Sequence, residues 1–146
     1  MRYQSKPASC GPTALRNALQ SRGILRSEDE LALLVGCTAE GTSARGLLKA
    51  AHMIAVDEPK IAPGVLSERR GDVALLKLHA ALRTGVVGIL CVDSFEHWVT
   101  AFGLLGDDVV HVADSADPEM VLHYAPGKLL ERWRGPGKSG YYGILL

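Results

Sequence analysis

Two hydrophobic patterns divide this chain of 146 residues, and their order along the sequence is the strongest constraint on its fold. Up to about residue 84, apolar residues recur every three or four positions, which is typical of amphipathic helices. Beyond that point short apolar runs alternate with turn residues, and the run 86–92 indicates a central strand buried on both faces. Helices followed by antiparallel strands predict an α+β fold, because alternating βαβ units would mix the two patterns.

Turn and capping residues locate the expected elements more closely. The length is sufficient for one folded core, so we expect a single domain over residues 1–146. We expect helices over 10–22, after Ser27, after Ser43, from a cap at Asp72, and over 126–133, with an irregular segment or one short strand in 56–70. We expect strands over 86–92, 97–104, 109–113, 120–124 and 141–146, with a hairpin turn at 106–108.

Composition argues against several classes of protein. Sixteen basic residues balance sixteen acidic ones, so we expect no nucleic-acid partner. No apolar run approaches ~18 residues, so we expect no transmembrane segment, and the polar N-terminus does not resemble a signal peptide. The three cysteines, Cys10, Cys37 and Cys91, lack C-x-x-C spacing. This spacing argues against a disulfide scaffold or a metal site, and it favours a reducing, cytoplasmic compartment.

Cys10 stands where the first helix is expected to begin. Pro12 follows closely, and proline is tolerated in a first helical turn because its missing N–H has no helical partner. A helix N-terminus lowers the pKa of a thiol from ~8.5, which favours a reactive thiolate. Gln4 lies six residues upstream and could donate a side-chain N–H to an oxyanion. The alternative is a buried structural cysteine, the setting of most free cysteines.

His97 and Asp114 are the other candidates for chemistry. His97 opens one expected strand and Asp114 ends the next, so a hairpin turning at 106–108 would bring them together. An aspartate beside a histidine can orient the imidazole and stabilise its charged form, as in a catalytic triad. Asp117 is a rival for this role, and either aspartate could instead be a turn former before Pro118. His97 could equally be an ordinary surface or capping histidine.

Four segments spread along the chain resemble one family, the papain-like cysteine peptidases that process bacteriocin precursors. In that family the domain is fused to an ABC transporter and removes double-glycine leader peptides. The segments are Gln4 with Cys10-Gly11-Pro12-Thr13-Ala14-Leu15, then Gly41-Thr42-Ser43 with Gly46-Leu47 and Ala50-Ala51, then His97-Trp98-Val99-Thr100 with Gly103 and Val110-His111-Val112-Ala113-Asp114, and finally residues 129–133 with Tyr141-Tyr142-Gly143-Ile144.

The resemblance implies a papain-like fold, in which an N-terminal helical half carrying Cys10 packs on a C-terminal antiparallel sheet carrying His97 and Asp114. It also implies roles: Gln4 as oxyanion donor, Cys10 as nucleophile, His97 as base and Asp114 as orienter. The family often has Asp-Pro at the third position, whereas here Pro118 follows Asp117, so Asp117 stays the alternative. No transporter segment is present within the chain.

The expected function is that of a cysteine peptidase, acting on a peptide or protein substrate through a Cys10 thioester. By resemblance, cleavage would follow small, Gly-Gly-like residues. The reaction needs no metal and no cofactor. Two alternatives share the fold: a non-catalytic peptide-binding or regulatory module, and a thioester-based acyltransferase. The sequence leaves the oligomeric state open.

Overall fold

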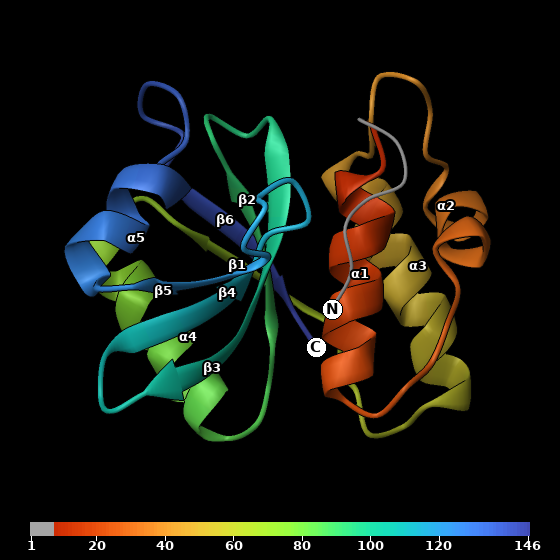
Figure 1. The fold of residues 1–146 in the computed structure, drawn as a ribbon, viewed down its shortest axis with the longest axis horizontal. Helices are drawn as coiled ribbons and strands as arrows, with labels where there is room; N and C mark the ends of the chain where they lie inside the picture. Colours follow the sequence, from red (N-terminus) through yellow and green to blue (C-terminus); the bar gives the residue numbers. More distant parts are fainter. Residues whose placement is uncertain (1–7) are drawn as a thin grey trace.

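The computed structural model describes residues 8–146 and combines a helical half with a curved sheet (Figure 1). Gln4, the expected oxyanion donor, lies outside the described residues. The helices are α1 (Cys10–Ser21), α2 (Glu28–Val35), α3 (Ala44–Asp57), α4 (Gly71–Arg83) and α5 (Pro126–Trp133). The strands are β1 (Gly64–Glu68), β2 (Gly88–Val92), β3 (His97–Leu105), β4 (Val109–Ala113), β5 (Val121–Tyr124) and β6 (Tyr141–Leu145).

All six strands form one antiparallel sheet in the order β1-β6-β2-β3-β4-β5. Every residue of β2 is buried, as expected for the continuous apolar run in that part of the sequence. The C-terminal strand β6 inserts between β1 and β2, so Tyr142 lies opposite Ser67 on one side and Cys91 on the other. Strand β6 is thus hydrogen-bonded to two strands that lie far from it in the sequence.

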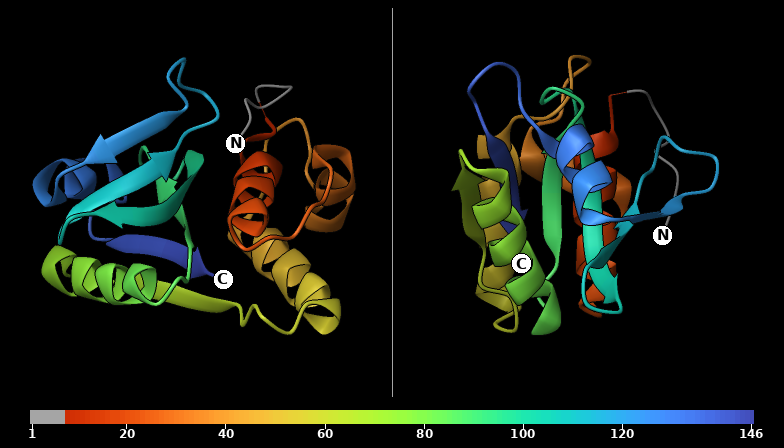
Figure 2. Two further views of the ribbon diagram at one scale, coloured as in Figure 1. Left: turned by 60° about the horizontal axis from the view of Figure 1, so that its bottom comes forward. Right: turned by 90° about the vertical axis from the view of Figure 1, so that its left-hand side faces the viewer.

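Helices cover both faces of the sheet (Figures 1 and 2). Helices α1, α2 and α3 form the layer on one face, where Leu15, Leu19, Leu47 and Ile89 belong to one buried cluster. Helices α4 and α5 cover the other face, where Leu78, Trp133 and other apolar side chains form a second cluster. The expected α+β architecture is confirmed, whereas the order of the elements gave no sign that α4 packs opposite the first three helices.

The N-cap residues predicted from the sequence are confirmed at two helices and wrong at a third. The hydroxyls of Ser27 and Ser43 accept the N–H groups of residues three positions later, as expected of N-caps. The prediction that Asp72 caps α4 is wrong, because the helix already begins at Gly71. The Asp72 carboxylate lies in the first turn, where it pairs with Arg70.

Within the part of the chain that the structure describes, no helix is long and apolar enough to cross a membrane. Among the same residues, no three histidine, cysteine or acidic side chains lie close enough together to hold a metal ion.

Candidate active site

Cys10 is the first residue of α1 and is 7% exposed. The helix behind it is firmly seated, because Leu15 and Leu19 are fully buried. The hydroxyl of Thr100 on β3 donates a hydrogen bond of 2.8 Å to the carbonyl of Ala14. The N-terminus of α1 is therefore fixed directly against β3, the strand that begins at His97.

His97 and Asp114 meet at one end of the β3–β4 hairpin. Thr100 pairs with Ala113 in the sheet, which places the start of β3 beside the end of β4. The Nε2 atom of His97 lies 2.7 Å from Oδ1 of Asp114. Both side chains are largely buried, with 13% of His97 and 4% of Asp114 exposed.

Asp117, the alternative partner for His97, lies in the turn that follows. Its carboxylate accepts the N–H of Glu119 at 2.9 Å, and its own N–H donates to the carbonyl of Asp114. These are bonds of a local turn, which is the structural role that the sequence had left open for an aspartate before Pro118. The carboxylate that the structure places against His97 is therefore that of Asp114.

The three side chains shift one another's titration. Burial alone would raise the pKa of Asp114, but hydrogen bonds from His97, the Ala116 N–H and Arg132 hold it well below its usual range. Burial alone would lower the pKa of His97, but its bonds to Asp114 and Cys10 raise it to about 9. Burial would raise the pKa of Cys10, yet His97 and the N–H groups of Trp98 and Gly11 lower it. The arrangement favours a thiolate–imidazolium pair.

The proton positions follow from these charges. An ionised carboxylate only accepts hydrogen bonds, so Nε2 of His97 must carry the proton that faces Asp114. The other ring nitrogen of His97, Nδ1, is then the atom that makes the hydrogen bond with Cys10. Nδ1 is thus the ring nitrogen that faces the thiol. The contact with the ionised Asp114 favours this arrangement of the ring protons.

Arg132 on α5 completes the cluster, and the sequence gave no indication of it. One of its terminal nitrogens lies 2.7 Å from Oδ2 of Asp114, the carboxylate oxygen that His97 does not use. The same guanidinium makes two bonds to Asp93, of 3.0 and 2.9 Å, and one of 3.0 Å to the hydroxyl of Tyr124. Asp93 lies 39 residues from Arg132 in the chain, which is too far for a local motif to reveal the contact.

A hollow of about 320 Å³ opens between the two halves, and Trp98, whose backbone N–H bonds the Cys10 thiol, is one of its lining residues. The structure brings the segments 41–43 and 95–98 together around it. Trp98 is 5% exposed, and its indole N–H donates to the carbonyl of Thr42 at 3.1 Å. The lining residues are Thr42, Ser43, Ala44, Cys91, Phe95, Trp98 and Tyr142.

The other two cysteines have different surroundings. Burial raises the pKa of the Cys91 thiol on β2 to about 12, so Cys91 stays protonated. Cys37 is half-buried and its sulfur lies 3.4 Å from the carbonyl of Ala8. Of these thiols, Cys10 is the one that hydrogen-bonds a histidine, and this bond helps to lower its pKa.

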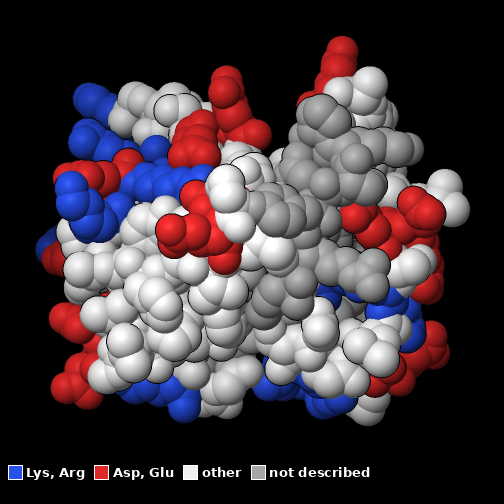
Figure 3. Space-filling view, viewed as in Figure 1, with Lys and Arg blue, Asp and Glu red and all other residues white. Residues whose placement is uncertain are grey.

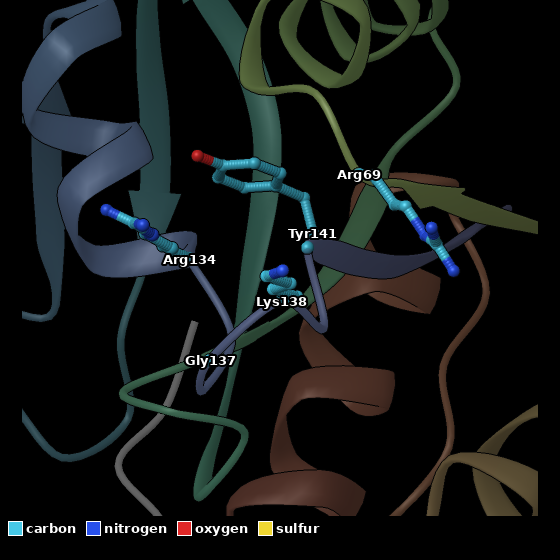
Figure 4. A pocket seen from close by; sticks show the side chains of 6 residues that line it. Arg69, Arg134, Gly137, Lys138 and Tyr141 are labelled. Atoms are coloured by element: carbon cyan, nitrogen blue, oxygen red, sulfur yellow. The ribbon is translucent and has the colours of Figure 1, made fainter.

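A second hollow, of about 340 Å³, lies beyond the C-terminal end of α5 (Figure 4). Arg69, Arg134 and Lys138 line it together with Gly137, Gly140 and Tyr141. Its lining residues include none of Cys10, His97 and Asp114 and none of the residues that hydrogen-bond them, so this hollow is separate from the candidate active site.

No protein-family model matches the chain. An uncharacterised protein from Methanothermobacter marburgensis is 36% identical over 74 residues, which are 51% of this chain and 52% of that protein. The lactococcin-A transport/processing ATP-binding protein LcnC from Lactococcus lactis is 27% identical over 126 residues, 86% of this chain and 16% of that protein. The chain thus spans about half the length, or less, of these curated relatives.

Two solved structures resemble the whole chain. The peptidase domain of Streptococcus ComA, a bifunctional ABC transporter involved in quorum sensing, has a TM-score of 0.71 at 20% identity, covering 99% of this chain and 95% of its own. A double-glycine-motif protease from a transporter, crystallised with the leader peptide, has a TM-score of 0.71 at 15% identity, covering 97% and 86%. These matches confirm the expected fold, because both solved structures are peptidase domains or proteases of transporters and share it over nearly the whole chain.

Proposed function

We propose that this protein is a cysteine peptidase in which Cys10 is the nucleophile, His97 the base and Asp114 the orienter. The observation that carries the proposal is the continuous chain of contacts from the Cys10 thiol through His97 to Asp114. A structural cysteine gains nothing from a buried imidazole whose pKa is about 9 and which is itself held by a carboxylate.

The first half of the reaction forms a thioester. The Cys10 thiolate attacks the carbonyl carbon of the scissile bond, and the carbonyl oxygen becomes an oxyanion. The N–H of Cys10, at the start of α1, is proposed to stabilise this charge, and Gln4 is proposed as the second donor. One such donor contributes about 2.7–4 kcal/mol to the transition state. The His97 imidazolium then gives its Nδ1 proton to the leaving amine, and the C–N bond breaks.

The second half releases the acyl group. Neutral His97 now takes a proton from a water molecule, which attacks the thioester carbonyl. The C–S bond breaks, the carboxylic acid product leaves, and the proton returns the site to its thiolate–imidazolium state. Asp114 stays ionised throughout and keeps Nε2 protonated.

We propose that the substrate is a peptide cut after small residues such as Gly-Gly. The protease from the transporter in the comparison is described as acting on a double-glycine motif and was crystallised with a leader peptide. Its fold matches 97% of this chain, which supports a peptide substrate here as well. The wall formed beside Cys10 by the buried Trp98 and the partly buried Thr42 supports small residues next to the scissile bond.

The test is cleavage of a fluorogenic peptide that ends in Gly-Gly before the reporter amine. We expect turnover by the wild-type protein and none by Cys10→Ala, together with a trapped thioester at Cys10 in acid-quenched samples analysed by mass spectrometry. Peptide binding without cleavage by the wild type would favour a peptide-binding module. Product formed only when an amine acceptor is supplied would favour an acyltransferase.

A further inference from the structure

We propose that Arg132 is a positioning residue of this active site: its guanidinium holds both Asp114 and the loop that carries His97, and so fixes the imidazole between them. This inference rests on the proposed function, because it assigns Arg132 a role in orienting the base. Arg132 is not among the groups that interact with the Cys10 thiol, so it acts on the site through the two aspartates.

Both carboxylate oxygens of Asp114 are bound by side chains. His97 occupies Oδ1 at 2.7 Å and Arg132 occupies Oδ2 at 2.7 Å. The N–H of Ala116 also donates to Oδ1, at 3.0 Å. With both oxygens bound from different elements, the carboxylate cannot rotate about its side chain without breaking a charge-assisted hydrogen bond. The direction in which Oδ1 faces the imidazole is thus set partly from α5.

Arg132 also binds the loop between β2 and β3, whose backbone conformation is unusual. Asp93, Ser94 and Phe95 all have positive φ angles, of 54°, 58° and 67°. Residues other than glycine rarely adopt this backbone conformation. Such a loop needs surrounding contacts to hold it. Arg132 binds both carboxylate oxygens of Asp93, and its carbonyl accepts the Asp93 N–H at 3.0 Å. His97 follows this loop directly.

Lysine could not replace the geometry of this contact. Three nitrogens of the guanidinium serve three partners, Asp93, Asp114 and Tyr124, on three separate elements of the chain. A guanidinium presents five N–H donors in a rigid fork, whereas an ammonium group is a single point of charge. Arg132 is also mostly buried, with 21% of its side chain exposed. The contact therefore specifies a geometry as well as a charge.

The titratable and charged groups around the base come from several elements of the fold. Cys10 on α1 and Asp114 after β4 face His97 directly, and Arg132 on α5 faces Asp114. Asp93 faces Arg132 from the loop before β3, and the Tyr124 hydroxyl faces it from β5. Acidic and basic side chains gather in Figure 3 at the upper left, over the end of the molecule where Figure 1 places α5. Removing the cation leaves two neighbouring carboxylates without their shared partner.

The experiment measures how fast iodoacetamide alkylates Cys10 as a function of pH, read at this residue by peptide mapping. In the wild type we expect an acid-shifted profile, since the pKa of Cys10 is lowered. In Arg132→Gln, loss of the cation and loss of the Asp114 orientation both destabilise the thiolate. The acid limb should therefore move to higher pH by about one unit, a roughly tenfold lower rate at acidic pH.

Arg134→Gln is the matched control. Arg134 lies two residues further along, is exposed, and forms no ion pair with a carboxylate of residues 8–146; it lines the separate hollow of Figure 4. Its profile should equal that of the wild type. Arg132→Lys keeps the charge without the fork and should fall between wild type and Arg132→Gln. In an Asp114→Asn background, Arg132→Gln should add little, because both act along one path.

The outcomes separate the two proposals. An ordinary thiol profile for Cys10 in the wild type would overturn the proposed function. An acid-shifted wild type with an unchanged profile in Arg132→Gln would overturn the role of Arg132 and leave the proposed function standing. A wild-type alkylation profile in Arg132→Lys would also overturn the role of Arg132, because a positive charge without the guanidinium geometry would then be sufficient. Should Arg132→Gln fail to fold by circular dichroism, Arg132→Lys and Asp93→Asn provide the same comparison.

Discussion

His97 and Asp114 are 17 residues apart in the chain and 2.7 Å apart in space, the distance between Nε2 and Oδ1. The β3–β4 hairpin produces this proximity, because the start of its first strand lies beside the end of its second. The third partner, Cys10, arrives from the opposite layer on the end of a helix. The candidate site therefore exists only when the two halves of the molecule are packed together.

The first prediction concerns the nucleophile. Cys10→Ala should abolish turnover and leave the fold intact, because the side chain lies at a helix end and only one sulfur atom is removed. Cys91→Ala should lower the free energy of unfolding without abolishing turnover, since Cys91 is buried and stays protonated. Cleavage rates and chemical denaturation of each variant check this. Full activity of Cys10→Ala would contradict the enzymatic proposal.

The second prediction concerns the orienter. Asp114→Asn should lower kcat by about 10²–10⁴-fold, the range that general acid–base catalysis contributes, with KM little changed. An amide can turn its N–H₂ toward the imidazole and so favour the wrong tautomer. Asp117→Asn is the control and should be nearly silent, because Asp117 bonds only within its turn. A larger loss in Asp117→Asn would reverse the assignment.

The third prediction concerns pH. The pKa of His97 is raised to about 9, so the imidazolium persists through neutral pH and is lost as the pH rises through that value. The pKa of Cys10 is lowered, so the thiolate forms on the acid side. A plot of kcat/KM against pH should therefore rise as Cys10 ionises and fall near pH 9.

The same measurement on Asp114→Asn provides the check on this assignment. The bond to Asp114 is what raises the pKa of His97 most strongly against burial, so the alkaline limb of the variant should move to lower pH. An alkaline limb of the wild type near 6.5, the ordinary value for histidine, would contradict the thiolate–imidazolium pair.

Sequence patterns were sufficient for the elements and for part of the site. Periodicity located the helices and strands, and a hairpin argument brought His97 to Asp114, because these features depend on neighbours in the chain. Patterns were not sufficient for β6, which pairs between β1 and β2 through long-range contacts. The sequence also did not show against which face of the sheet α4 packs. The pattern of an amphipathic helix shows which of its sides is buried, but not which element covers that side.

Arg132 was hidden for a related reason. It lies in a short helix next to Trp133, which is fully buried, and its position on the edge of the buried stripe resembles that of any solvated arginine. Its partners Asp93 and Asp114 belong to two separate turns, each of which has a local explanation for an aspartate. Only the packing of α5 against both turns reveals the contact.

The fourth prediction concerns Gly11, the residue after the nucleophile. A Cβ atom at this position would lie 2.6 Å from Cβ of Thr42, closer than packed atoms tolerate. Alanine would favour the helix by about 1 kcal/mol, but forced overpacking costs about 1–3 kcal/mol and displaces the Thr42 carbonyl that binds Trp98. Gly11→Ala should therefore lose stability and activity together, measured by denaturation and peptide cleavage.

Two further variants test the cause of that loss. Thr42→Gly removes the clashing atoms, so the double variant Gly11→Ala/Thr42→Gly should recover part of the lost stability. Gly127→Ala is the matched control in α5, where nothing lies within 4 Å of the added atom, and it should stabilise the protein slightly. An equal loss in both alanine variants would show that helix geometry, and not Thr42, is responsible.

The last prediction concerns specificity and rests on the proposed function. The residues before the scissile bond must pass between the segments 41–43 and 95–98, which meet beside Cys10 through the Trp98–Thr42 hydrogen bond of 3.1 Å. That bond is partly buried and links the two segments, so we expect that the passage does not widen without breaking it.

A peptide library varied at the two positions before the cut should therefore show a preference for glycine and alanine. Phe95 lines the hollow from a partly exposed position, and Phe95→Ala should relax the preference toward larger side chains while Cys10 keeps its alkylation profile. Trp98→Phe, which removes the indole N–H and keeps an apolar ring, should relax it as well if the bond to Thr42 holds the passage closed. A wild-type preference for bulky or charged residues would contradict the double-glycine proposal and leave a cysteine peptidase of another specificity.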